Sequence, residues 1–208
     1  MNGIIKKRIF ITGMTIVIAA AMTAAIFAAL YYTGCLLPRW AKWHDVTIDV
    51  KGGKCITDGR EEALQEPDNS VEEGPDMIEL KHRKVRAYKD GRCIFESPGI
   101  CRVQNVFYED IDRDGKRELI FLNFNVGRFG SHRPFWVGRN EGKWFQHIYI
   151  YDYISEEEMF RPIWMASDIG MDAVDMRIKD KGVVEMEDRY GARSDWMWIS
   201  FGLRCVSE

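Results

Sequence analysis

The hydrophobic pattern divides the chain into one uninterrupted apolar run and a longer part in which apolar and polar residues alternate. Residues 9–37 contain no Asp, Glu, Lys or Arg. Roughly 20 apolar residues in a helix are enough to cross a bilayer core, so the run predicts a transmembrane helix over residues 9–37. Lys6, Lys7 and Arg8 precede it and predict a cytoplasmic tail at residues 1–8, with the remainder outside the cell membrane.

Two other interpretations of the apolar run remain open. A cleaved secretory signal has an apolar region of about 7 to 15 residues, which this run exceeds. Gly34 and Cys35 form the ending of a lipoprotein signal, although a tyrosine stands where such signals usually carry leucine. We therefore expect a single-pass anchor, with lipoprotein processing at Cys35 as the alternative. Trp40 and Trp43 fall where an interfacial aromatic belt is expected.

Residues 38–79 are predicted to be a juxtamembrane segment and an acidic linker. The stretch 61–79 contains eight acidic residues, no Lys or Arg, and two prolines. Such a composition buries little apolar surface and repels itself. The sequence therefore predicts that the compact domain spans residues 80–208.

Strand-like alternation dominates residues 80–208. Asp90-Gly91 between two alternating segments is a strong hairpin signal, and two apolar segments flank the acidic loop at 110–118. We also predict a hairpin that turns at Gly138 to Gly142, another that turns at Lys179 to Gly182, and a closing strand near residues 195–206. One short helix is predicted at Ser155, which resembles a helix cap. The expected fold class is mostly β, an antiparallel sandwich or a partial propeller.

The acidic loop has the spacing of a calcium site. An EF-hand-type loop takes its ligands from positions 1, 3, 5, 7 and 9, with glycine at 6. These positions correspond to Asp110, Asp112, Asp114, the Lys116 carbonyl and Glu118, with Gly115 at the turn. Position 12 is Phe121 instead of glutamate, and the flanks favour strands. We therefore predict a β-loop-β calcium site, and the competing interpretation is a solvated acidic turn.

The stretch "DIDRDGKRELIFLNF" resembles the calcium loops of FG-GAP and VCBS repeats in integrin-like β-propeller blades. That resemblance covers about 25 residues and implies a structural calcium ion. The chain has one such loop, whereas a closed propeller has several blades. The stretch "GRFGSHRPFWVGRNEGKWFQHIYIYDY" resembles membrane-anchored proteins of Gram-positive bacteria, which implies no particular function.

Charge and cysteine content limit the remaining functions. The chain has 29 Lys and Arg against 32 Asp and Glu, the wrong sign for counterion release on nucleic acid. Outside Cys35, an even number of cysteines leaves disulfides and free thiols equally open; these are Cys55, Cys93, Cys101 and Cys205. A zinc site at His132 and His147, or a serine nucleophile at Ser131, has little support because neither shows the expected ligand spacing or elbow motif.

Aromatic residues suggest either a core or a binding surface. Trp196 and Trp198 share one strand face, as do Tyr149, Tyr151 and Tyr153. Other aromatics in this part of the chain are Trp136, Trp144, Trp164, Phe135 and Phe145. We expect most of them to form the core, and the rest to offer a surface for a glycan or protein partner. The sequence thus favours a binding or interaction module over the alternative, a cell-envelope enzyme that acts on glycans.

Overall fold

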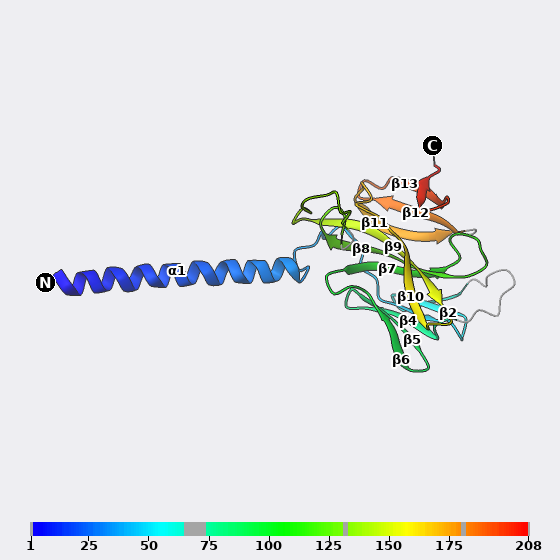
Figure 1. Ribbon diagram of the computed structural model, residues 1–208, viewed down its shortest axis with the longest axis horizontal. Coiled ribbons are helices and arrows are strands. Elements are labelled where there is room, and N and C mark those ends of the chain that lie inside the picture. Colours follow the sequence, from blue (N-terminus) through cyan, green and yellow to red (C-terminus); the bar gives the residue numbers. More distant parts are fainter. Residues whose placement is uncertain (1, 65–73, 131–132, 180–181, 208) are drawn as a thin grey trace. The chain divides into compact units, whose positions relative to one another are not determined.

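The computed structural model describes residues 2–64, 74–130, 133–179 and 182–207, with side chains described from residue 13 onward (Figure 1). The chain forms two compact units, residues Met1–Pro38 and Arg39–Glu208. The first unit contains one helix and the second contains the β-strands. The predicted fold class is confirmed: the chain is mostly β, and its antiparallel sheets follow one apolar N-terminal helix in the sequence.

Helix α1 spans Asn2–Tyr32. Its segment Gly13–Tyr32 is long and apolar enough to cross a membrane. The predicted end at residue 37 is wrong because Gly34, at φ 78°, closes the helix. The Gly34 N–H donates to Tyr31 O, and the Cys35 N–H donates to Leu30 O, which is the glycine-dependent Schellman ending of a helix.

Within the residues that the structure describes, the β unit contains three antiparallel sheets. The first has the order β3-β2-β1-β4-β5-β6, with bounds Val46–Asp49 (β1), Lys54–Thr57 (β2), Arg60–Ala63 (β3), Met77–Lys81 (β4), Lys84–Lys89 (β5) and Arg92–Glu96 (β6). The second has the order β10-β9-β8-β7, with bounds Arg102–Glu109 (β7), Glu118–Val126 (β8), Trp144–Ile154 (β9) and Met159–Met165 (β10). The third has the order β11-β12-β13-β14, with bounds Ala173–Lys179 (β11), Val183–Asp188 (β12), Arg193–Trp198 (β13) and Leu203–Cys205 (β14).

The second sheet is the middle layer, and both of its faces are buried. Phe121 and Tyr149 on one face pack in a cluster with Ile78 and Val85 of the first sheet. Residues of the other face pack in a second cluster with the third sheet; they include Ile120, Leu122, Ile148 and Ile150, opposite Met176, Val184 and Met186. This burial on both faces explains why β8 contains four consecutive apolar residues at 119–122 instead of a strict alternation.

The predicted domain boundary at residue 80 is wrong. Strand β1 pairs with β4 in the register Val46↔Leu80, so the described part of 38–79 forms half of the first sheet. Strand β3 is an edge strand with every residue exposed. Its charged residues discourage pairing with a further strand. The same charges give this region the composition of a linker, and for that reason the sequence predicted a linker here. Residues 65–73 of the predicted linker lie outside the described part.

Three of the predicted elements differ from those of the structure. Ser155 begins a four-residue turn between β9 and β10 instead of a helix. The predicted strand before Gly138 is absent, because residues 133–143 form a connection and β9 begins at Trp144. The predicted closing strand is a hairpin of β13 and β14. The hairpin at Asp90-Gly91 and the pairing of β11 with β12 are confirmed, although residues 180–181 lie outside the described part. All five cysteines are free thiols in this structure.

Candidate functional site

The acidic loop joins β7 to β8 and is organised by its own carboxylates. Asp110 Oδ1 accepts the backbone N–H groups of Arg113 at 2.7 Å and Asp114 at 3.2 Å, and its Oδ2 accepts that of Gly115 at 3.0 Å. Asp112 Oδ1 accepts the Asp114 N–H at 3.1 Å. Gly115 has φ 91°, a conformation that favours glycine. The sequence folds here into a tight turn because aspartates readily accept nearby backbone N–H groups.

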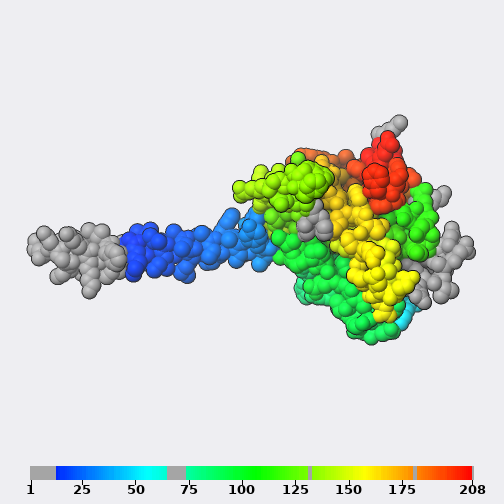
Figure 2. All heavy atoms as spheres, viewed as in Figure 1, coloured from blue at the N-terminus to red at the C-terminus, as the bar shows by residue number. Residues whose placement is uncertain are grey.

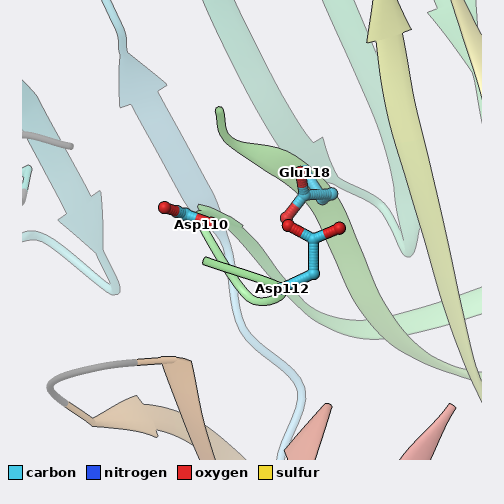
Figure 3. Close-up of side chains that lie close together, drawn as sticks. All are labelled: Asp110, Asp112 and Glu118. Carbon is cyan, nitrogen blue, oxygen red and sulfur yellow. The ribbon is translucent and has the colours of Figure 1, made fainter. Parts of the chain in front are cut away.

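Three carboxylates of this loop come together. Asp110, Asp112 and Glu118 each offer an oxygen within 4.8 Å of the other two (Figure 3). Figure 3 shows the carboxylates of Asp112 and Glu118 turned toward each other, with Asp110 beside them. Glu118 is only 2% exposed, and its Oε2 accepts the Ile111 N–H at 2.9 Å. The group therefore combines oxygen ligands from the start of the loop and from the first residue of β8.

Burial and mutual repulsion disfavour negative charge in this group. Burial, followed by the charges of the neighbouring aspartates, raises the pKa of Glu118 to about 9, against the opposing effect of the Ile111 N–H. Burial and the nearby Asp114 also raise the pKa of Asp112. A cation placed between these oxygens would lower the pKa values of both Glu118 and Asp112, because opposite charge favours the ionised carboxylate.

The third sheet fixes one side of the loop. Gly182, in the turn between β11 and β12, has φ 66°. A Cβ at this residue would lie 2.9 Å from Asp110 O and 3.0 Å from Ile111 O. Ile111 itself is 1% exposed and packs in the cluster between the second and third sheets. The start of the loop is thus packed against the third sheet, while Arg113, Asp114 and Lys116 are exposed to solvent.

The donor set fits a hard cation. Calcium takes six to eight oxygen ligands, including carboxylates, backbone carbonyls and waters, and the three grouped side chains supply oxygen only. Of the predicted ligands, Asp110, Asp112 and Glu118 are grouped. Asp114 lies outside that group, and its Oδ1 accepts the Lys116 N–H at 2.8 Å. Ligation of an ion by any of the five predicted groups, including Asp114 and the Lys116 carbonyl, stays a prediction.

A second cluster of titratable side chains was not predicted from the sequence. His44 Nδ1 lies 2.7 Å from Asp58 Oδ2, and Nε2 lies 3.2 Å from Asp175 Oδ1. Lys42 Nζ is 3.3 Å from the other Asp175 oxygen. A carboxylate can only accept hydrogen bonds, so the ring satisfies both partners fully only as imidazolium, with both nitrogens donating. No local sequence pattern predicts this cluster, because Asp175 lies 131 residues from His44 along the chain.

In this His44 cluster, made of Lys42, His44, Asp58 and Asp175, the last three residues line a cavity of about 560 Å³. Arg60, Arg177 and Asn105 contribute to the same lining. The hydrogen bond to Asp175 raises the pKa of His44; burial opposes this effect and the bond to Asp58 supports it. Burial alone would raise the pKa of Asp175, but the bond from His44 holds it below its ordinary value.

The stabilisation that His44 provides should depend on pH. Because the folded pKa of His44 is raised, its contribution is complete below about pH 6.5, its unfolded value, and is lost as the pH rises through the folded value. We expect His44→Gln to lower the free energy of unfolding by about 1.5 kcal/mol at pH 5.5, as for hydrogen bonds to charged groups, and by less at pH 8.5. Urea unfolding of both chains at each pH measures this difference, and the other titrating groups, present in both chains, largely cancel. An equal loss at both pH values would refute a charged His44.

The other histidine, serine and aromatic residues singled out in the sequence lie in different surroundings. His132 and Ser131 lie outside the described residues. His147 is fully buried on β9, and its Nδ1 is 3.0 Å from Ala166 O. Tyr149, Tyr151 and Tyr153 belong to the first core cluster as predicted, whereas Phe135 and Trp136 are 91% and 73% exposed. Trp164 and Trp196 line a smaller cavity of about 270 Å³ together with Asp168.

No known protein family, curated protein or solved structure matches this chain.

Proposed function

We propose that the chain is a membrane-anchored, extracytoplasmic binding or interaction module whose β unit contains one structural calcium site. The convergence of Asp110, Asp112 and Glu118 carries this proposal. A buried glutamate beside two aspartates is costly without a cation. Because Asp110 and Asp112 belong to the loop and Glu118 begins β8, a bound ion would tie the loop to the strand and stabilise the unit in a structural role. The resemblance to FG-GAP and VCBS loops supports the same structural role.

The proposed location rests on the apolar segment Gly13–Tyr32 and on the basic residues that precede this segment. Gly13–Tyr32 can cross a membrane, and the basic residues Lys6, Lys7 and Arg8 favour a cytoplasmic N-terminus. The β unit would then be outside the cell, where calcium is abundant enough for sites with a Kd of about 10⁻⁴ to 10⁻³ M. Its partner would be a glycan or a protein, and the cavity with Trp164 and Trp196 offers flat aromatic surface for a sugar ring.

Labelling of cysteines tests the proposed orientation. Cys205 is exposed on β14. A full-length variant that keeps Cys205 as its one cysteine should react with a membrane-impermeant maleimide in intact cells. A matched variant with Lys6→Cys as its one cysteine should react after lysis alone. The opposite pattern would place the β unit in the cytoplasm and contradict the proposal.

The cavity at His44 favours a second candidate, an enzyme of the cell envelope that acts on glycans. Its volume of about 560 Å³ lies in the range of about 300 to 1,000 Å³ that is typical of small-molecule sites. Asp58 and Asp175 line it together, and paired acids are the usual machinery of glycoside hydrolysis. Against this function, His44 holds both carboxylates in ion pairs. Hydrolysis of an envelope glycan that disappears in Asp175→Asn and persists in Glu118→Gln would establish the enzyme.

A further inference from the structure

The connection from β8 to β9 exposes two large aromatic side chains. Phe135 is 91% and Trp136 is 73% exposed, and their rings meet edge to face with centroids 4.9 Å apart. Figure 2 shows the yellow-green residues of this connection protruding from the surface of the β unit. Exposed aromatic surface contributes little to the stability of the unit that carries it, so an adjacent exposed pair indicates an external contact.

The turn that carries the aromatic pair has a defined shape. The Val137 N–H donates to Pro134 O at 3.0 Å, and the Arg133 guanidinium donates to Gly138 O at 2.6 Å. These two bonds close the turn on either side of Phe135 and Trp136. A pre-shaped turn loses less conformational entropy on binding than an unstructured one.

The charge of this turn is opposite to that of the unit around it. Residues 133–143 contain Arg133, Arg139 and Lys143 against one acid, Glu141. Of the 29 basic residues of the chain, three precede residue 9, and none of the 32 acids precedes residue 39. The β unit therefore has 26 basic and 32 acidic residues. A basic aromatic turn on an acidic unit is complementary to an anionic surface.

The turn emerges from the end of the sheet at which the chain enters the β unit. Trp40 and Trp43 pack on Phe124, with ring centroids 6.2 Å and 5.6 Å apart. Phe124 lies two residues before the end of β8, from which the connection to β9 departs. Trp40 follows Tyr32, the last residue of α1, by eight residues. Since extended chain spans at most about 3.6 Å per residue, Trp40 lies within about 29 Å of the helix end.

We propose that Phe135 and Trp136 insert into the interfacial layer of the bilayer that α1 crosses, while Arg133 and Arg139 contact anionic phospholipid headgroups. Aromatic side chains favour this layer, and basic residues near it are attracted to anionic lipid. The turn then acts as a second contact that restricts how the β unit faces the membrane. This proposal rests on the membrane anchoring proposed above.

Fluorescence of the full chain in vesicles tests the docking. The chain is reconstituted into phosphatidylcholine vesicles with or without phosphatidylglycerol, and some lipids carry a nitroxide near the headgroup end of the acyl chain. The emission of Trp136 is obtained as the difference between the wild-type chain and Trp136→Phe. We expect this emission to be shifted to the blue and quenched when phosphatidylglycerol is present. The emission of Trp198, obtained in the same way, serves as control and should not be quenched.

Charge variants and flotation complete the test. Arg139→Gln should lower the ratio of docked to undocked turn about fivefold, as for one basic residue near an anionic surface, while Arg204→Gln, an exposed arginine on β14, should leave it unchanged. If the chain floats with the vesicles but Trp136 emits as in water and is not quenched, the docking proposal is wrong and the anchoring stands. If the chain does not float, both are wrong.

Discussion

Glu118→Gln is expected to stabilise the β unit in the absence of calcium and to abolish its stabilisation by calcium. Glutamine has the same shape and can keep an acceptor for the Ile111 N–H, which Glu118 binds at 2.9 Å. It removes the carboxylate whose pKa burial raises to about 9. Without calcium, the gain should be about 1 kcal/mol, in the range for relieving an unfavourable buried polar group.

Calcium should stabilise the wild-type chain and leave the stability of Glu118→Gln unchanged. At 100 times Kd, a ligand that binds the folded state alone adds about 2.7 kcal/mol, and for a unit of this size each kcal/mol raises the Tm by about 2 to 4 °C. The wild-type chain in detergent micelles should therefore melt about 5 to 10 °C higher with calcium than with a chelator. Glu118→Gln should show no such rise in thermal melts followed by circular dichroism.

Glu109→Gln is the matched control for this prediction. Glu109 lies opposite Glu118 in the register of β7 and β8 and is outside the carboxylate group. It should keep the full calcium-dependent rise in Tm. A rise that survives Glu118→Gln would show that calcium acts elsewhere on the chain.

Phe121→Ala should be the most destabilising of the substitutions discussed, because Phe121 connects two sheets. Its ring stacks on Tyr151 with centroids 5.5 Å apart and meets Phe95 of the first sheet at 6.4 Å. It is completely buried. Removing such a ring leaves a cavity and costs about 3 to 5 kcal/mol, which corresponds to a fall in Tm of about 10 °C.

Phe135→Ala makes the same chemical change at a residue that is 91% exposed. It should alter the free energy of unfolding by about 0.5 kcal/mol or less. Urea unfolding of the full chain carrying either Phe121→Ala or Phe135→Ala measures the difference between their free energies of unfolding. A loss below about 1.5 kcal/mol for Phe121→Ala would contradict the packing of the first sheet on the second.

The sequence predicted the elements whose signals are local. Asp90-Gly91 determined one hairpin, and the apolar runs beside the acidic loop determined β7 and β8. It failed where local signals conflict with the packing of distant segments. Strands β1 to β3 are four residues each, too short for alternation to stand out, and the acids of β3 have the composition of a linker. Ser155 resembles a helix cap, but the four residues between β9 and β10 leave room for a turn alone.

The two clusters differ in how far the sequence could reveal them. The acidic loop is contiguous, so spacing alone predicted a group of oxygen ligands there, and the structure brings three of the predicted side chains together, Asp110, Asp112 and Glu118. The His44 cluster joins residues that are 131 positions apart. The Lys42 N–H donates to Val174 O of β11 and the His44 N–H donates to Gln104 O of β7, which brings the two segments together. No pattern along the chain reports such a distance. The exposure of Phe135 and Trp136 could not be predicted either, because aromatic residues near strands usually belong to a core.

Calorimetric titration of calcium into the full-length chain tests the central claim most directly. We predict binding of one calcium ion per chain, with a Kd on the order of 10⁻⁴ to 10⁻³ M, as in extracellular calcium modules, and loss of that binding in Glu118→Gln. An absence of binding at millimolar calcium in the wild-type chain, or equal binding in the two chains, would contradict a calcium site at residues 110–118.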